Sequence, residues 1–258
     1  MRTDPLRVPV QVVVLAAGMG TRLGGPVPKP LTPLRDGRTI LQRQLDNLRS
    51  VLGPAVEITA VVGYECEQVM RAAPDLRFVY NPDFARTNTA KSLLRALRAT
   101  GDDGVLWLNG DVVFSSGVLQ EALPLLHDGQ SFVCVDTAAV GEEEVKYTLA
   151  PDGAIDELSK TVIGGLGEAV GINHVSAADK ATLVEHLAAC ADSDYFERGI
   201  ETAIAEAGLR FLPLDITAFP AVEVDFESDL QRANTVFYGN LAVPPEFVGD
   251  SGWAVDAG

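Results

Sequence analysis

The chain has 258 residues, of which 47% are hydrophobic and 22% charged, and this composition excludes a disordered, fibrous or membrane-spanning protein. Its longest apolar runs, such as Val12 to Ala17, are far shorter than the ~20 residues of a bilayer-crossing helix. The net charge of −16 argues against a nucleic-acid or anionic-membrane partner. Pro9 and Gln11 interrupt the apolar stretch near the N-terminus, so no secretory signal is predicted and we expect a cytoplasmic protein.

The charges are unevenly distributed along the chain. The first 100 residues contain 14 Lys and Arg against 8 Asp and Glu, whereas the other 158 contain 6 against 28. A basic first half could receive a polyanion while an acidic second half supplies carboxylates for a metal, although a solvated acidic surface explains most of the excess. Specific motifs must therefore decide the function.

Strand and helix patterns alternate over the first 135 residues. The expected strands are β-branched and apolar, and the helix after Thr39 carries its leucines on one face. Strands are expected at Val10 to Ala16, Val56 to Val62, Leu76 to Tyr80, Val105 to Asn109 and Ser131 to Val135, and helices at Ile40 to Leu52 and Thr89 to Ala99. This alternation predicts a parallel sheet with helices on both faces.

The pattern changes after residue 135. Asp152-Gly153 is a hairpin turn signal between Lys146 to Ala150 and Ala154 to Ser159, and Ala169 to Val175 is a third extended segment. We therefore expect a β-rich insertion at about residues 141–175. Helices are then expected at Ala177 to Ala189, Tyr195 to Ala207 and Ser228 to Phe237, and strands at Leu209 to Leu214 and Ala221 to Val224. The pattern predicts a single domain over residues 1–240 and an irregular tail over 241–258.

The first strand runs into a glycine-rich loop that also carries two cations. The segment from Leu15 to Leu23 contains Gly18, Gly20 and Arg22, and Lys29 follows shortly after it. Backbone N–H groups in such a turn can surround phosphate oxygens, and the two cations add positive charge to the same place. The loop is neither a Walker loop nor a GxGxxG fingerprint. A purely structural turn would not need the cations, so the pattern favours phosphate binding.

The segment from Leu15 to Leu23, with Lys29-Pro30-Leu31, resembles the signature of the nucleotidyltransferases that activate sugar phosphates and alcohol phosphates. The resemblance implies an α/β fold, Rossmann-like and of the glycosyltransferase-A type, with a mixed, mainly parallel sheet, helices on both faces and a small β-rich insertion. It also implies that the loop holds the triphosphate of an NTP. The implied nucleotide-binding residues of the loop are Leu15, Ala16, Ala17, Gly18, Gly20, Thr21, Arg22 and Lys29, of which Arg22 and Lys29 are also catalytic.

Two later segments, Asn109-Gly110-Asp111 and Glu223-Val224-Asp225, are similar to the metal-binding segments of that family. Asp111 follows a predicted parallel strand, where ligands bind in open α/β sheets, and two carboxylates with phosphates and waters suffice for Mg²⁺. We therefore expect Asp111 and Asp225 to be catalytic Mg²⁺ ligands and Gly110 to contact the nucleotide. The alternatives are capping or turn formation for Asp111 and a solvated acidic surface around Asp225.

Further segments look most like the cytidylyltransferases of the phosphocholine, inositol-phosphate and phosphonate type. They are Asn81-Pro82, Thr87 to Leu93, Val145-Lys146 through Ser159-Lys160, Gly167 to Ile172 and Asp194 to Glu197. The chain has Ser159-Lys160-Thr161 in place of the Glu-Lys-Pro string of many sugar-phosphate thymidylyl- and uridylyltransferases. This departure disfavours a hexose 1-phosphate as the acceptor.

These segments contain candidates for the base and acceptor sites. Asn88 and Ser92 lie one helical turn apart and are expected to face the base, although Asn88 is equally suited to cap the helix. Lys146 and Lys160 are expected to bind the acceptor phosphate, with weak surface salt bridges as the alternative. The resemblance adds Glu168 and Tyr195 to the acceptor-binding residues.

We therefore expect a Mg²⁺-dependent enzyme that transfers CMP from CTP to a phosphate- or phosphonate-bearing small molecule and releases pyrophosphate. One alternative is a sugar 1-phosphate or molybdopterin nucleotidyltransferase that uses another NTP. A more distant alternative is a nucleotide-binding module without catalytic activity, against which the combination of Lys29, Asp111 and Asp225 argues.

Overall fold

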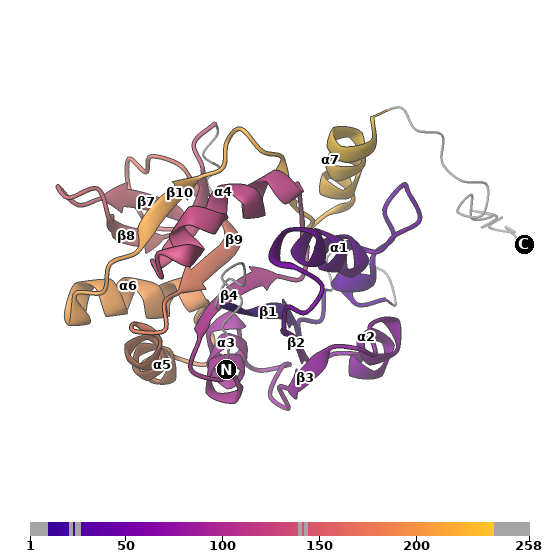
Figure 1. Cartoon of the computed structure of the whole chain (residues 1–258), viewed down its shortest axis with the longest axis horizontal. Coiled ribbons are helices and arrows are strands. Elements are labelled where there is room, and N and C mark those ends of the chain that lie inside the picture. Colours follow the sequence, from indigo (N-terminus) through magenta and orange to yellow (C-terminus); the bar gives the residue numbers. More distant parts are fainter. Residues whose placement is uncertain (1–9, 21–22, 24–26, 139–140, 142–143, 240–258) are drawn as a thin grey trace, which may run out of the picture.

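The computed structural model describes residues 10–20, 23, 27–138, 141 and 144–239, and over this range the chain folds around one large sheet (Figure 1). Its strands are β1 (Val10–Ala16), β2 (Ile58–Val62), β3 (Arg77–Tyr80), β4 (Gly104–Asn109), β6 (Phe132–Asp136), β7 (Lys146–Leu149), β8 (Ile155–Ser159), β9 (Glu168–Val175) and β10 (Leu212–Asp215). A second, two-stranded sheet pairs β5 (Val112–Phe114) with β11 (Ala221–Glu223). The helices are α1 (Ile40–Leu52), α2 (Cys66–Ala72), α3 (Thr89–Ala99), α4 (Ser116–His127), α5 (Lys180–Ala189), α6 (Phe196–Ala207) and α7 (Glu227–Tyr238), with a short 3₁₀ helix, η2, at Lys29–Leu31.

The main sheet has the strand order β10-β6-β9-β4-β1-β2-β3. Its strands are parallel from β4 to β3 and again between β6 and β10, whereas β9 runs antiparallel to both β4 and β6. The expected mixed, mainly parallel sheet is therefore confirmed. Strand β9, which the sequence pattern groups with the β7–β8 hairpin, pairs with β7 and also lies in the middle of the main sheet between β4 and β6.

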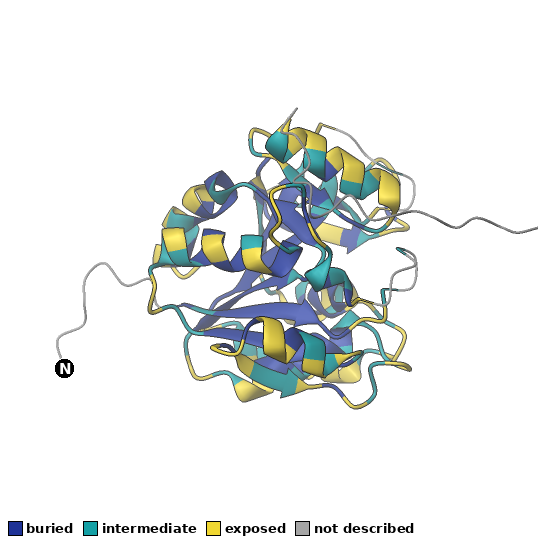
Figure 2. Cartoon of the chain, turned by 90° about the vertical axis from the view of Figure 1, so that its right-hand side faces the viewer, coloured by how far each residue is buried: buried dark blue, intermediate teal, exposed yellow. Residues whose placement is uncertain are grey.

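Side chains of successive residues in β1 point to opposite faces of the sheet. Val12 and Val14 pack with α1 and α4, whereas Val13 and Leu15 pack with α3, α5 and α6. Figure 2 shows the buried strands between helices whose outer sides are exposed. The expectation of helices on both faces is confirmed.

The N-terminus of α1 has the capping signal expected there. The hydroxyl oxygen of Thr39 accepts the Gln42 backbone N–H at 3.2 Å, and the Gln42 side chain accepts the Thr39 backbone N–H at 2.9 Å. This reciprocal pair satisfies two donors that would otherwise be unpaired at the helix start.

The sequence patterns did not predict α2, α4 or β5. Helix α4 contains Gly117 and Pro124, which are both unfavourable inside a helix. Helix α2 is seven residues long and starts after Glu65, whose backbone is left-handed and whose side chain makes no cap. The expected tail at 241–258 lies outside the described residues. Within them, no helix is long and apolar enough to cross a membrane.

Candidate active site

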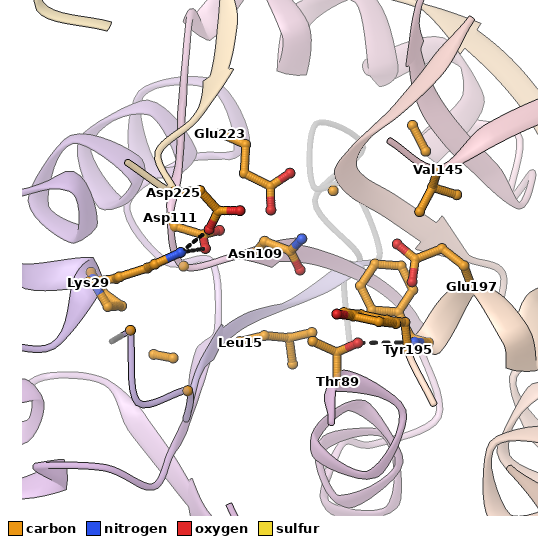
Figure 3. A pocket seen from close by; sticks show the side chains of 18 of the residues that line it. Leu15, Lys29, Thr89, Asn109, Asp111, Val145, Tyr195, Glu197, Glu223 and Asp225 are labelled. Atoms are coloured by element: carbon orange, nitrogen blue, oxygen red, sulfur yellow. Dashed lines mark hydrogen bonds and ion pairs between the residues drawn. The ribbon is translucent and has the colours of Figure 1, made fainter. Parts of the chain in front are cut away.

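The Lys29 ammonium lies between two carboxylates that are far from it in the sequence. Its Nζ is 3.2 Å from Asp111 Oδ2 and also forms an ion pair with Asp225 Oδ1 (Figure 3). The three side chains predicted to handle phosphates and metal are thus brought together at the carboxyl ends of β1 and β4.

The pairing of β5 with β11 places the two aspartates side by side. Glu223 is opposite Val112 in the antiparallel register, and the Val224 N–H donates to the Asp111 carbonyl at 3.0 Å. Asp225 is the next residue after Val224, so this hydrogen bond holds it beside Asp111. The Asp229 carboxylate then accepts the Asp225 backbone N–H at 3.1 Å, so this acidic residue has a structural role at the start of α7.

A buried glutamine and a close backbone approach hold the turn that carries Asp111. The Gln44 amide of α1 donates to the carbonyls of Asn109 and Val112 at 2.9 and 2.8 Å. The Gly110 N–H donates to the Leu15 carbonyl at 2.9 Å, and a Cβ at Gly110 would lie 2.7 Å from that same oxygen. Only glycine allows this approach, which fixes Asp111 relative to the phosphate-binding loop.

A cleft of about 680 Å³ opens at this edge of the sheet. Figure 3 shows Lys29, Asp111, Asp225 and Glu223 on one side of it and Tyr195, Glu197 and Val145 on the other. The other described residues that line it are Leu15, Ala16, Gly18, Gly20, Pro30, Thr89, Asn109, Gly110, Glu144, Lys160, Ala169, Gly171, Phe196 and Phe226.

The described part of this lining is strongly acidic, with five carboxylates against the two ammonium groups of Lys29 and Lys160. Burial raises the pKa of Asp111, and the Lys29 charge opposes that rise. Burial, followed by the charges of Asp111 and Asp225, raises the pKa of Glu223 well above its ordinary value. Burial lowers the pKa of Lys29, but the two aspartates outweigh it, so the net direction is upward. The site therefore favours added positive charge.

The carboxylates of this cluster fit a divalent cation. Asp111 Oδ1 is buried and has no hydrogen-bond partner among the described residues, so it is available as an oxygen ligand. The described residues contain no group of three or more His, Cys, Asp or Glu arranged to hold a metal. Mg²⁺ usually takes one or two carboxylates and completes its shell with waters and substrate phosphates, so Asp111 and Asp225 form a suitable donor set.

The glycine-rich loop contributes part of the cleft. Leu15, Ala16, Gly18 and Gly20 line it, while Ala17 is buried beside them. The predicted loop residues Thr21 and Arg22 lie outside the described residues.

Asn88 and Ser92, expected at the base, make other contacts. Asn88 caps α3, because its Oδ1 accepts the Thr89 N–H at 2.8 Å. Ser92 is buried and its Oγ accepts from Asn81 Nδ2 at 3.1 Å. Neither residue lines the cleft, whereas Thr89 does. The Thr89 hydroxyl accepts the Phe196 N–H at 3.0 Å and so joins the starts of α3 and α6.

The four acceptor candidates separate into two pairs. Lys160 and Tyr195 line the cleft, with Lys160 Nζ 5.3 Å from the centre of the Tyr195 ring. Lys146 and Glu168 are cross-strand partners on β7 and β9 and are not part of the cleft lining. Burial raises the pKa of Glu168, whose carboxylate accepts the Gly141 N–H at 3.3 Å.

Several residues of the cleft were not among the predicted site residues, and Asn109, Glu197 and Glu223 are three that lie in or next to predicted motifs. Asn109 and Glu223 adjoin the two predicted metal ligands in the sequence, and Glu197 ends the Asp194 to Glu197 segment. Proximity to those motifs is the signal that could have identified them.

Known proteins share sequence and fold with this chain. Residues 12–208 match the MobA-like NTP transferase domain. The CMP-5'-(3-aminopropyl)phosphonate synthase of Streptomyces rubellomurinus is 43% identical over 125 residues, covering 45% of this chain and 19% of that protein. The bifunctional protein GlmU of Acaryochloris marina is 32% identical over 133 residues, covering 50% of this chain and 29% of that protein. The matched region thus spans less than a third of either curated relative.

Solved structures of several enzymes share the fold. The inositol-1-phosphate CTP transferase from T. maritima has a TM-score of 0.72 at 16% identity, over 90% of this chain and 98% of that one. The CTP:phosphocholine cytidylyltransferase LicC from Streptococcus pneumoniae has a TM-score of 0.69 at 17% identity, over 88% of this chain and 98% of that one. The glycosyltransferase-A-like fold expected from the sequence is confirmed. Because the family match covers well over half of its length, the chain belongs to the MobA-like NTP transferases.

Proposed function

We propose that this protein transfers CMP from CTP to a phosphonate- or phosphate-bearing small molecule and releases pyrophosphate. The observation that carries the proposal is the cluster of Lys29, Asp111 and Asp225 inside a cleft at the carboxyl ends of the parallel strands. Family membership supports NTP transfer. The segment shared with a CMP-aminopropylphosphonate synthase supports CMP as the transferred group and a phosphonate as the acceptor.

In the proposed reaction, an oxygen of the acceptor attacks the α-phosphorus of CTP in line and forms a new P–O bond. The bond from that phosphorus to the oxygen bridging to the β-phosphate breaks, and pyrophosphate leaves with the electron pair. Catalysis of this kind depends on positioning and charge neutralisation. The described lining contains no serine, cysteine or histidine, so we propose direct transfer without a covalent enzyme intermediate.

Each cation has a proposed role. Lys29 binds phosphate oxygens of CTP, and so does Arg22, by its place in the glycine-rich loop. Lys160, whose ammonium lies over the Tyr195 ring, binds the anionic group of the acceptor. Asp111 and Asp225 hold Mg²⁺, which neutralises phosphate charge when it is bound. Lys29 would then turn from the carboxylates toward the triphosphate.

The nucleoside is proposed to lie against Leu15, Ala16, Gly18, Gly20 and Thr89. A backbone carbonyl near Ala16 can accept from the exocyclic amine of cytosine, which uracil lacks. The Asn88 side-chain oxygen already accepts the Thr89 N–H, so we assign base reading to the loop backbone instead. A buried polar group left unpaired by the wrong base costs about 1–3 kcal/mol.

A second candidate is the activation of a sugar 1-phosphate with another NTP. It is favoured by the likeness to a putative glucose-1-phosphate thymidylyltransferase from Bacillus anthracis, which has a TM-score of 0.69 at 17% identity. It differs from the first candidate in the base and in the acceptor, and both can be tested together.

The test is a matrix of pyrophosphate release with CTP, UTP, GTP, ATP and dTTP against 3-aminopropylphosphonate, phosphocholine, inositol 1-phosphate and glucose 1-phosphate. We expect CTP to exceed UTP by at least about tenfold in kcat/KM, the ratio given by ~1.4 kcal/mol. We also expect the phosphonate to be the best acceptor. A preference for UTP or dTTP with glucose 1-phosphate would establish the second candidate, and no release in any combination would overturn both.

A further inference from the structure

Glu197 is a buried carboxylate at the cleft, and one of its two oxygens has no hydrogen-bond partner among the described residues. It is the second residue of α6 and only 9% exposed. Its Oε2 makes no hydrogen bond to any described residue. Figure 3 shows the side chain across the cleft from Lys29 and the two aspartates. A buried carboxylate normally has a donor, since an unpaired one is costly, so a ligand is the natural source of that donor.

The nearest cation does not fill this role. Burial raises the pKa of Glu197 to about 7, and this effect outweighs the opposing effects of its own backbone N–H and of the Lys160 charge. The ammonium of Lys160 lies over the Tyr195 ring, and no ion pair joins it to Glu197 among the described residues. Glu197 therefore retains an unmet preference for a positive group.

The surroundings of Glu197 also favour a cation. Glu144 and Glu223 line the same cleft, so with Asp111 and Asp225 assigned to Mg²⁺ and Lys29 to the triphosphate, three glutamates of the described lining remain against the one ammonium of Lys160. Tyr195 is 45% exposed and its ring already faces one ammonium, and aromatic faces attract such groups. A neutral polyol would gain hydrogen bonds here but would not relieve the excess of negative charge.

We propose that Glu197 binds a protonated amine on the acceptor, so that the acceptor is a zwitterion with an ammonium at one end and a phosphonate or phosphate at the other. This proposal rests on the proposed function and specifies its substrate class. In this arrangement the anionic end lies against Lys160 and faces the Lys29 side of the cleft, and the ammonium lies against Glu197 at the start of α6. Glu197 is thereby a residue for acceptor selection rather than for the transfer chemistry.

The test compares three acceptors with the same chain length: 3-aminopropylphosphonate, 3-hydroxypropylphosphonate and propylphosphonate. With the wild-type protein, Mg²⁺ and CTP, we expect kcat/KM to be at least about 30-fold higher for the amine than for propylphosphonate. Glu197→Gln should reduce that ratio at least tenfold through the acceptor KM, with little change in the KM for CTP. Glu197→Asp, which keeps the charge, should retain part of the ratio.

Glu201→Gln is the matched control, because Glu201 lies one turn along α6, outside the cleft, and pairs with Arg198 at 2.5 Å. It should leave the amine-to-propyl ratio unchanged. Thermal unfolding of each variant tests whether the fold is retained. If Glu197→Gln does not fold, Glu197→Ala replaces it, and an unchanged ratio in a folded variant without the carboxylate would overturn the proposal.

Calorimetric binding of the three phosphonates separates this proposal from the proposed function. Amine-dependent binding that is lost in Glu197→Gln, without pyrophosphate release in the wild type, would support the ammonium site and overturn CMP transfer. Turnover that is equal for the amine, hydroxyl and propyl compounds would support CMP transfer and overturn the ammonium site. A preference for the hydroxyl compound would also overturn it.

Discussion

Lys29 Nζ donates to Asp111 Oδ2 at 3.2 Å across 82 residues of sequence, and the same ammonium pairs with Asp225. The cation thus occupies the position between two carboxylates that a divalent metal would share. Lys29 stabilises these carboxylates before substrate binds, and Mg²⁺ competes with it for the same oxygens. The stability and the metal response of the protein are therefore coupled through one side chain.

Lys29→Ala should destabilise the metal-free protein by about 1–3 kcal/mol. Removing one partner of a fully buried ion pair costs more free energy than this. Lys29, Asp111 and Asp225 all keep some contact with solvent, which reduces the loss. Added Mg²⁺ should raise the Tm of the variant more than that of the wild type, because the two aspartates then have no competing ammonium. Turnover should fall at least about 100-fold. Thermal unfolding with and without Mg²⁺, and pyrophosphate release, measure these effects.

Arg38→Ala is the control for Lys29→Ala, since Arg38 pairs with Asp46 at 3.3 Å on the surface and both are about half exposed. We expect it to cost less than about 1 kcal/mol and not to alter the response to Mg²⁺. Equal stability of the two variants would show that the ion pairs of Lys29 stabilise the fold no more than a surface ion pair does.

Asp111→Asn and Asp225→Asn should each raise the Mg²⁺ concentration needed for half-maximal activity by at least about tenfold, equivalent to ~1.4 kcal/mol of binding. A neutral amide is a poor substitute for a carboxylate on a hard cation. Magnesium titrations at saturating CTP measure the shift. An unchanged titration for Asp225→Asn would remove it from the metal ligands.

The sequence predicted the scaffold of the site better than its lining. The apolar runs located β1 and α3 with the bounds observed in the structure, because buried strands and amphipathic helices have a strong periodic signal. The periodicity could not predict that Gln44 is buried in the apolar face of α1. Its amide donates hydrogen bonds to carbonyls 65 and 68 residues away in the sequence, and only the tertiary fold brings these groups together.

Local sequence also could not predict which of the expected binding residues line the cleft. Asn88 could be a cap or a base-binding residue, and local sequence cannot distinguish these roles because both place Asn at a helix start. Lys146 and Lys160 belong to one hairpin, yet only Lys160 lines the cleft. Glu197 has the sequence context of an ordinary acidic residue in a first helical turn, and only the tertiary fold, in which α6 packs against α5, β8 and α3, buries it.

Lys160→Ala should raise the acceptor KM at least about tenfold and the CTP KM by less than about threefold. Lys160 lies on the Tyr195 side of the cleft, away from Lys29, so its charge acts mainly on the acceptor. Lys146→Ala should have a smaller effect on the acceptor KM, since Lys146 is not part of the cleft lining. Equal changes in both substrates' KM for Lys160→Ala would place this cation with the triphosphate.

His174 should make the stability of the protein depend on acid pH. It is buried on β9, its ring is stacked on Phe132 with centroids 5.4 Å apart, and its Nδ1 donates to the Gln130 carbonyl at 2.7 Å. Burial lowers the pKa of His174 to about 4, below the value of about 6.5 in an unfolded chain. The unfolded state therefore binds the proton first as pH falls, and native stability decreases from about pH 6.5 down to about pH 4.

The size of this loss is about 3 kcal/mol for a pKa difference of that order. His174→Asn keeps a donor near the Nδ1 position but does not titrate, so the variant should lose less stability than the wild type between pH 7 and pH 4.5. His127→Asn, at an exposed position, should follow the wild type. Urea unfolding at several pH values measures the three slopes, and parallel slopes for His174→Asn and wild type would show that another group controls the acid response.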